Sequence, residues 1–143
     1  MAMTMHCDIV SAEREIYSGP VTMLIATGEL GELGITPRHQ QLLTRLKPGH
    51  IELRVQHKEM AEIFYVSGGF LEVQPHAVTV LADTVERGDE LDEEAARQAL
   101  EEAQRLLKDQ EEGRNVATAE AMLAQAAAQL RIIEELRKKG LMK

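Results

Sequence analysis

The stretch IELRVQ at residues 51–56 places an apolar side chain at every second position. A β-strand with one buried and one solvated face requires this period of two, whereas a helix repeats its apolar residues every three or four positions. Short apolar segments, several with the same alternation, lie on both sides of this stretch. The chain from His6 to about Ala82 is therefore predicted to be β-structure.

Turn residues separate these segments at intervals of roughly ten residues, which favours a sandwich or barrel and leaves no room for helical crossovers. Glycine and proline mark positions where φ is positive or fixed. These breaks fall at Gly19-Pro20, Gly28 to Gly34, Pro37, Pro48-Gly49, Gly68-Gly69 and Pro75-His76. The predicted strands are residues 8–11, 15–18, 21–27, 33–36, 50–56, 62–67, 70–74 and 78–82.

Beyond Gly88 the pattern changes, because proline is absent and apolar residues recur at three and four positions. Asp92 is predicted to cap a helix that ends near Glu112, with Gly113 at C′, and Asn115 to cap a second helix. Two helices with a short connection form an antiparallel hairpin. The predicted apolar stripes are Ala96, Ala99, Leu100, Ala103, Leu106 and Leu107, and then Ala119, Met122, Leu123, Ala126, Leu130, Ile133 and Leu136. We expect an all-β sandwich domain at residues 1–88 followed by a two-helix hairpin at residues 89–143.

The hairpin is predicted to be only weakly held. Residues 92–112 carry eight acidic and three basic side chains, and residues 113–143 carry three acidic and six basic ones. The helices therefore attract each other, but a surface ion pair contributes at most about 1 kcal/mol. The predicted seam between these stripes is rich in alanine, which buries little apolar area. Such an arm can dock and still separate.

Composition excludes several classes of function. Aromatic residues make up 3%, the net charge is -8 and the pI is near 5.1, which argues against a nucleic-acid-binding surface. Apolar runs are far shorter than the roughly 20 residues of a membrane span, and the N-terminus lacks a secretory pattern, so neither insertion nor export is expected. The single cysteine, Cys7, agrees with a reducing compartment.

No set of side chains predicts an enzyme or a metal site. The histidines lack metal-ligand spacing and are interpreted as surface or rim residues. Cys7 has no cationic neighbour in sequence and is predicted to be a buried structural thiol. Ser67-Gly68-Gly69 is interpreted as a hairpin turn. The five histidines are His6, His39, His50, His57 and His76.

Two segments are candidates for contact with partner proteins. In GELGELG at residues 28–34, Glu29 and Glu32 would repel a bound phosphate, so the segment is either an exposed flexible loop or a protein-contact loop. The only basic cluster lies near the C-terminus, where it is either a solvated helix end or a docking surface for an acidic partner. That cluster is Arg131, Arg137, Lys138, Lys139 and Lys143.

A series of motifs in a fixed order carries a family resemblance across nearly the whole chain. The motifs are DIVSA at 8–12, GxxGELGI at 28–35 followed by Pro37 and His39, LLT at 42–44, KPG at 47–49, SGGxLEV at 67–73, VTVLAD at 78–83 and LDE at 91–93. Together they resemble the epsilon subunit of bacterial F-type ATP synthases.

The resemblance implies a non-catalytic rotor subunit of the central stalk, without a cofactor, on the cytoplasmic face of the bacterial inner membrane. It implies binding to the gamma subunit and the c-subunit ring, coupling of proton flow to ATP synthesis, and inhibition of hydrolysis by a helical arm that reaches the alpha/beta catalytic head. Matching positions imply c-ring contacts at Ser11, Glu29, Gly31, Glu32 and Leu33, gamma contacts at His39 and Thr44, and head contacts at Asp109, Arg131, Arg137, Lys138 and Lys139.

One departure from the family pattern concerns nucleotide binding. Some relatives bind ATP through a motif of leucine or isoleucine, aspartate, two variable residues, arginine and alanine. Here Leu91-Asp92 is followed by EEAA, so alanine stands in place of the arginine. Arg97 lies about 200° further round the helix, so tight nucleotide binding is not expected. Two alternatives stay open at this point: a chaperone-like adaptor with a short coiled-coil arm, and a small nucleotide-sensing domain.

Overall fold

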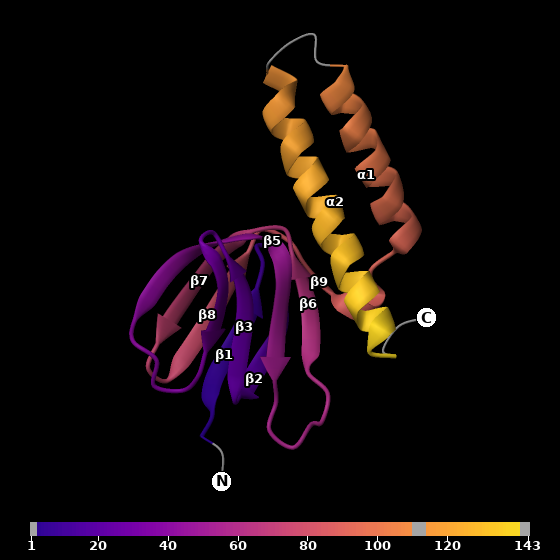
Figure 1. The fold of residues 1–143 in the computed structure, drawn as a ribbon. Coiled ribbons are helices and arrows are strands. Elements are labelled where there is room, and N and C mark those ends of the chain that lie inside the picture. The colour runs from indigo at the N-terminus through magenta and orange to yellow at the C-terminus, as the bar shows by residue number, and fades with distance from the viewer. Residues whose placement is uncertain (1–2, 110–113, 141–143) are drawn as a thin grey trace. The chain divides into compact units, whose positions relative to one another are not determined.

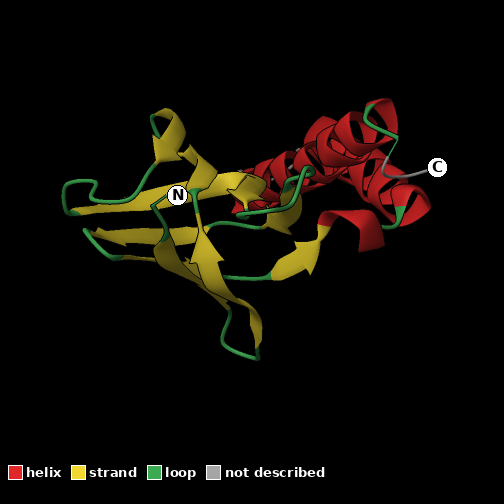
Figure 2. Ribbon diagram, turned by 90° about the horizontal axis from the view of Figure 1, so that it is seen from below, coloured by secondary structure: helices red, strands yellow, loops and turns green. Residues whose placement is uncertain are grey.

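The computed structural model describes residues 3–109 and 114–140. In chain order the described residues form nine strands, a short 3-10 helix at Gly88–Glu90 and two α-helices (Figure 1). The chain divides into two compact units, one ending at Arg87 and the other beginning at Gly88. Figure 2 shows the same division by structure type, with every helix following the last strand. The predicted fold class, a β-sandwich followed by a helical hairpin, is confirmed.

The strands follow the path β2-β1-β8-β7-β5-β3-β4, and β6 and β9 continue the sheet from β5. Every pair is antiparallel except β1–β8. The strands are β1 (Met5–Val10), β2 (Glu15–Val21), β3 (Met23–Gly28), β4 (Gly31–Ile35), β5 (Leu42–Arg54), β6 (Glu62–Val66), β7 (Gly69–Gln74), β8 (Ala77–Ala82) and β9 (Val85–Arg87).

The 13-residue strand β5 belongs to both layers of the sandwich. Its first part pairs with β7 from Leu42 to Leu46, and its second part pairs with β6 from Gly49 to Leu53 and with β3 up to Arg54. Gly49 lies where the strand passes between layers, and a Cβ there would lie 2.6 Å from the Thr27 hydroxyl oxygen. The absence of a side chain therefore lets β3 and β5 approach each other.

The core lies between the layers and follows the predicted alternation. Ile51 and Leu53 are fully buried, while Glu52 and Arg54 face the other side of β5. Burying each such side chain contributes about 1.5–3 kcal/mol, so this core supplies most of the stability of the unit. Its largest fully buried members are Phe64, Ile9, Leu24, Ile35, Ile51, Leu53, Leu71, Val21, Val66, Val73 and Val78.

Several predicted strand boundaries were wrong. Gly19-Pro20 lies inside β2, where proline is tolerated because β2 is an edge strand paired only with β1. Pro48-Gly49 lies inside β5, where it marks the passage between layers instead of a break. Residues 28–34 are not a flexible loop, because β3 and β4 pair through them as a hairpin. Strand β9 was missed, since three residues carry too little periodicity to detect.

The two helices are α1 (Glu93–Lys108) and α2 (Arg114–Lys138). The predicted cap is confirmed, because the Asp92 carboxylate accepts a 3.2 Å hydrogen bond from the backbone N–H of Ala95. The predicted end near Glu112 was wrong, since α1 ends at Lys108. The predicted C′ residue, Gly113, lies outside the described residues. Asn115 does not cap α2, because Arg114 before it already has helical backbone.

The helices run antiparallel and pack side by side (Figure 1). Small side chains dominate the buried positions, with Ala103 and Ala119 fully buried. Leu106 was predicted to face this seam, but it is 39% exposed. It lies about 100° round the helix from Leu107, which puts it at the margin of the stripe. The helix α2 also buries Ile132, Ile133 and Leu136, so large apolar side chains contribute to the helical unit beside the alanines.

Gly69 gives a test of the sheet geometry. Its φ is +138°, and an added Cβ would lie 2.1 Å from the Leu81 carbonyl oxygen. We expect Gly69→Ala to lower the free energy of unfolding of the sandwich by more than about 2 kcal/mol, because the β7–β8 pairing must shift. Urea unfolding followed by tyrosine fluorescence measures this, since both tyrosines, Tyr17 and Tyr65, lie in strands of this unit.

Gly31→Ala is the matched control. Gly31 has a similar φ of +135°, but nothing lies within 4 Å of the added Cβ. This variant carries the backbone strain without the collision, so it should lose roughly 1 kcal/mol. Equal losses in the two variants would contradict the close approach of β7 to β8.

Candidate functional site

The register brings four turns to one end of the sandwich, here called the hairpin end. Gly28, Leu46, Gly69 and Ala82 are paired in one row across β3, β5, β7 and β8. Val10 pairs with Leu81 in the neighbouring row, which carries the turn after β1 to the same end. The turns that gather there contain Ser11 to Arg14, Glu29-Leu30, Ser67-Gly68 and Asp83-Thr84.

The β3–β4 turn forms a tight, acidic tip at this end. Gly28 pairs with Gly31, which leaves only Glu29 and Leu30 in the turn, and Gly31 supplies the positive φ that closes it. The backbone N–H of Glu29 donates a 3.0 Å hydrogen bond to the Arg45 carbonyl. Leu30 is 100% exposed, and no ion pair holds Glu29 or Glu32 within the described residues. The tip is therefore rigid and available for contact.

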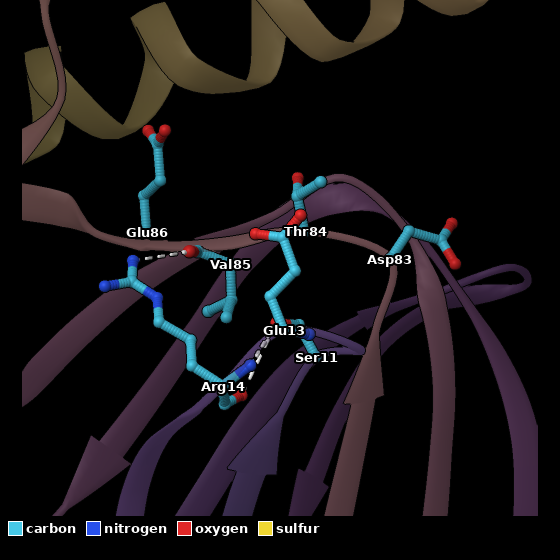
Figure 3. Close-up of a pocket in the computed structure, with 7 residues that line it drawn as sticks. All are labelled: Ser11, Glu13, Arg14, Asp83, Thr84, Val85 and Glu86. Atoms are coloured by element: carbon cyan, nitrogen blue, oxygen red, sulfur yellow. Dashed lines mark hydrogen bonds between the residues drawn. The ribbon is translucent and has the colours of Figure 1, made fainter.

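Ser11 lines a small open pocket of about 250 Å3 beside the β1–β2 turn (Figure 3). The Arg14 guanidinium crosses the pocket and donates a 3.5 Å hydrogen bond to the Val85 carbonyl. The lining is more acidic than basic, and no cluster able to hold a metal ion occurs among the residues with described positions. The full lining is Ser11, Glu13, Arg14, Asp83, Thr84, Val85 and Glu86.

The outer face of β5, β7 and β8 presents apolar side chains to solvent, here called the apolar face. Leu43 is 67% exposed, Phe70 41% and Leu81 45%. Phe70 pairs with Leu81 on β8 and with Arg45 on β5, so the three lie in one row. The Arg45 guanidinium lies 5.4 Å from the Phe70 ring centroid, which orients both side chains. A rigid sheet thus displays the kind of surface that partner proteins cover.

Polar side chains border the apolar face on β1 and β2. The Ser18 hydroxyl donates a 2.6 Å hydrogen bond to the Asp8 carboxylate, and the His6 ring lies 3.0 Å from the same oxygen. The Ser18 hydrogen bond, with that of His6 second, lowers the pKa of Asp8 below its ordinary value. Asp8 is therefore charged at neutral pH and fixes the two side chains beside it.

The two predicted gamma contacts lie apart. His39 is half-buried on the β4–β5 connection, near the turn at Pro75, because the N–H of Arg38 donates to the Pro75 carbonyl over 2.9 Å. Pro75 lies six residues beyond Gly69 along the chain, about 20 Å from the hairpin end. Thr44 is half-buried opposite the buried Leu71, so the exposed positions on this part of β5 are its neighbours, Leu43 and Arg45. The structure does not bring His39 and Thr44 together.

The five predicted head contacts also fall into two groups within the helical unit. Asp109 caps the C-terminal end of α1. Because the helices are antiparallel, the basic residues near the end of α2 lie at the other end of the hairpin. There Arg137 pairs with Glu93 of α1, and the Lys138 ammonium lies 3.9 Å from the Glu134 carboxylate. The exposed members of the basic group are Arg131, Arg137, Lys138 and Lys139.

Sequence reasoning missed Leu30 and the apolar face, although one signal for the face was present. Where two apolar residues are adjacent in a strand, one of them must point outward. Leu42-Leu43, Phe70-Leu71 and Val80-Leu81 are such pairs. Leu43, Phe70 and Leu81 are the exposed members. Their neighbours Leu42, Leu71 and Val80 lie inside or beside the core.

Two family models together span the chain. The model of the ATP synthase delta/epsilon chain β-sandwich domain matches residues 4–88, and the model of the delta/epsilon chain long α-helix domain matches residues 89–134. The chain belongs to the ATP synthase delta/epsilon chain family. The ATP synthase epsilon chain of Nitrosococcus oceani is 59% identical over 140 residues, covering 97% of this chain and 99% of that protein. The resemblance to the epsilon subunit is thus confirmed.

Chains in two solved structures share this fold. A chain of the Euglena gracilis mitochondrial ATP synthase, in a structure of OSCP, F1 and the c-ring, has a TM-score of 0.71 at 23% identity and covers 95% of this chain and 81% of that one. A chain of the Tetrahymena thermophila central stalk and c-ring structure has a TM-score of 0.57 at 16% identity, covering 90% and 96%. Among the helices with described positions, none has the length and apolarity to cross a membrane.

The predicted structural role of Cys7 can be tested chemically. The side chain is fully buried on β1, and burial, with the Asp8 charge second, raises the pKa of the thiol from 9.0 to about 12. We expect iodoacetamide at pH 8 to alkylate the folded chain at least 100-fold more slowly than the urea-unfolded chain, because the thiolate is scarce and shielded. Mass spectrometry measures this without ambiguity, since the chain has one cysteine.

The same shift sets a pH window for stability. Folding raises the pKa of the Cys7 thiol, so the protonated thiol contributes its full stability to the sandwich below pH 9. This contribution is lost as the pH rises from about 9 to 12. Cys7→Ala should remove that part of the alkaline decline. Equal alkylation of folded and unfolded chains would show that the thiol is accessible and would contradict the buried position.

Proposed function

We propose that this chain is the epsilon-type rotor subunit of an ATP synthase central stalk, with no catalytic group of its own. In this role it couples proton flow to ATP synthesis mechanically, through two partner surfaces on one rigid sandwich. The observation that carries the proposal is the coexistence of the apolar face and the acidic tip on strands with fixed register. The chain would lie peripherally at the cytoplasmic face of the membrane, held there by its partners.

The gamma subunit is the proposed partner of the apolar face. Leu43, Phe70 and Leu81 offer side chains already held by the sheet, so their burial requires little ordering of the backbone. A few well-packed anchor side chains carry most of the binding energy in protein interfaces, and arginine is frequent among them. Thr44 is adjacent to Leu43, and His39 would contact the same partner further along the sandwich.

The c-subunit ring is the proposed partner of the hairpin end. Glu29 and Glu32 are exposed carboxylates without ion pairs among the described side chains, which favours a partner loop that carries cations. Leu30 lies between them in the sequence, is fully exposed and would enter an apolar contact. Gly31 and Leu33 belong to the same hairpin, and the register brings Ser11 to the same end.

The helical unit is the proposed inhibitory arm. Alanine makes up much of its buried seam, so separation of the helices exposes less apolar surface than separation of a leucine seam would. The basic residues near the end of α2 would bind an acidic region of the alpha/beta head, with Asp109 at the opposite end of the hairpin. The proposed contacts on α2 are Arg131, Arg137, Lys138 and Lys139.

A charge placed on the apolar face tests the gamma assignment. We expect Leu43→Asp to weaken binding to purified gamma at least tenfold, because a carboxylate would be buried without a partner. Biolayer interferometry measures the affinity. Met60→Asp is the matched control, since Met60 is 48% exposed on the β5–β6 connection and outside the proposed interface. Unchanged binding by the Leu43 variant would assign gamma to another surface.

Removal of the helical arm tests whether the sandwich binds gamma and the helices inhibit hydrolysis. A chain ending at Gly88 should keep its affinity for gamma and raise the ATPase rate of the isolated catalytic head, because inhibition is assigned to the helices. Hydrolysis is followed by phosphate release with full-length chain as the reference. If the truncated chain lost gamma while hydrolysis stayed the same, the two units would have the opposite roles.

A further inference from the structure

The first residue of α1, Glu93, receives guanidinium groups from both helices. Arg97, one turn later in α1, donates a 2.7 Å hydrogen bond to one of its carboxylate oxygens. Arg137, 44 residues away near the end of α2, donates from both terminal nitrogens, one to each oxygen, the longer contact being 3.5 Å. One carboxylate thus joins the N-terminal end of α1 to the C-terminal end of α2.

The physical setting favours this arrangement. The hydrogen bond from Arg137 lowers the pKa of Glu93, so the carboxylate is charged at neutral pH. Its place in the first turn of α1 also suits the positive end of the helix dipole, while Arg137 lies in the last turn of α2, where cations are favoured. Both charges therefore stabilise their own helices and each other.

The neighbouring ion pairs each join two residues of the same helix. Arg97 lies 3.5 Å from Glu94 within α1, and Lys138 pairs with Glu134 within α2. Such pairs support a single helix but do not resist separation of the two. The Glu93–Arg137 pair must break when α1 and α2 come apart. The helix α2 also buries Ile133 and Leu136 close to Arg137 in the sequence, so the ion pair adds to apolar burial in opposing separation.

We propose that Glu93, held by Arg97 and Arg137, is a clasp that sets how often the two helices separate. A guanidinium from each helix is needed, because Arg97 alone would hold Glu93 within α1. The consequence for inhibition rests on the proposed function of the arm: loosening the clasp would release the helices for contact with the catalytic head more often. The clasp itself is a property of the isolated chain.

Amide hydrogen exchange of the full-length chain tests the clasp, because it reports rare openings. We expect Arg137→Gln to speed exchange of α1 amides, such as Ala103, by roughly two- to fivefold, and Glu93→Gln to do the same for α2 amides, such as Ala126. The effect crosses from one helix to the other, which a role confined to one helix cannot produce. The double variant should exchange no faster than the quicker single variant.

Two variants serve as matched controls. Glu94→Gln removes a pair internal to α1 and should leave α2 exchange unchanged, while Lys138→Gln removes a pair internal to α2 and should leave α1 unchanged. Core amides of the sandwich, such as Leu71, provide an internal reference. Raising KCl from 0.05 to 1 M should speed helix exchange in the wild type and have little effect in the double variant.

The outcomes separate the clasp from the proposed function. If Arg137→Gln left α1 exchange at the wild-type rate, or if both cross-helix effects were matched by the control variants, the clasp would be wrong. The exchange results could be as expected while the chain fails to inhibit hydrolysis by the catalytic head. That outcome would support the clasp and contradict the inhibitory role proposed for the arm.

Discussion

The pairing of β5 with three other strands is the constraint on which both proposed partner surfaces depend. From Leu42 to Leu46 this strand belongs to the layer with β7, and from Gly49 onward it lies between β3 and β6. Because side chains alternate along a strand, this pairing fixes which residues face the core. A slip of one residue would turn Ile51 and Leu53 to the surface, so the register is strongly determined by burial.

Two surfaces follow from that register without further elements. The row through Leu46 places the β3–β4 tip, with Leu30, at one end of the sheet, and the row through Arg45 aligns Phe70 and Leu81 on its outer side. Each surface is carried by backbone hydrogen bonds and not by a mobile loop. The helical unit differs in degree, since its buried helical residues are mostly alanines, with Ile132, Ile133 and Leu136 as the large ones. One chain thus combines a sandwich with a large apolar core and a helical unit whose seam is rich in alanine.

The fold class could be predicted because the spacing of apolar residues is clear. Apolar residues recur at every second position in residues 51–56 and at every third or fourth position beyond Gly88. The predicted strand and loop boundaries were wrong where glycine and proline lie within paired strands. Pro48-Gly49 marks the passage of β5 between layers, and the 28–34 segment pairs as a hairpin, although both contain the residues typical of loops. Such outcomes depend on long-range strand pairing, which local patterns do not contain.

The candidate surfaces were only partly predictable. The glycine-rich segment with Glu29 and Glu32 was identified as a contact candidate, but Leu30 was not, because full exposure of a leucine is invisible without the fold. The Glu93–Arg137 pair could not be found either, since 44 residues separate its members and only the length and pairing of the helices bring them together. The alanine content of the seam, by contrast, was readable directly, because helical spacing defines the stripe.

We propose that one rigid sandwich binds two partners through two distinct surfaces. A cryo-EM map of an ATP synthase assembled with this chain tests it most directly. We expect Leu43, Phe70 and Leu81 to be covered by gamma while Leu30 and its flanking glutamates contact the c-ring. A map in which the apolar face stays open to solvent, or in which the β3–β4 tip points away from the ring, would contradict it.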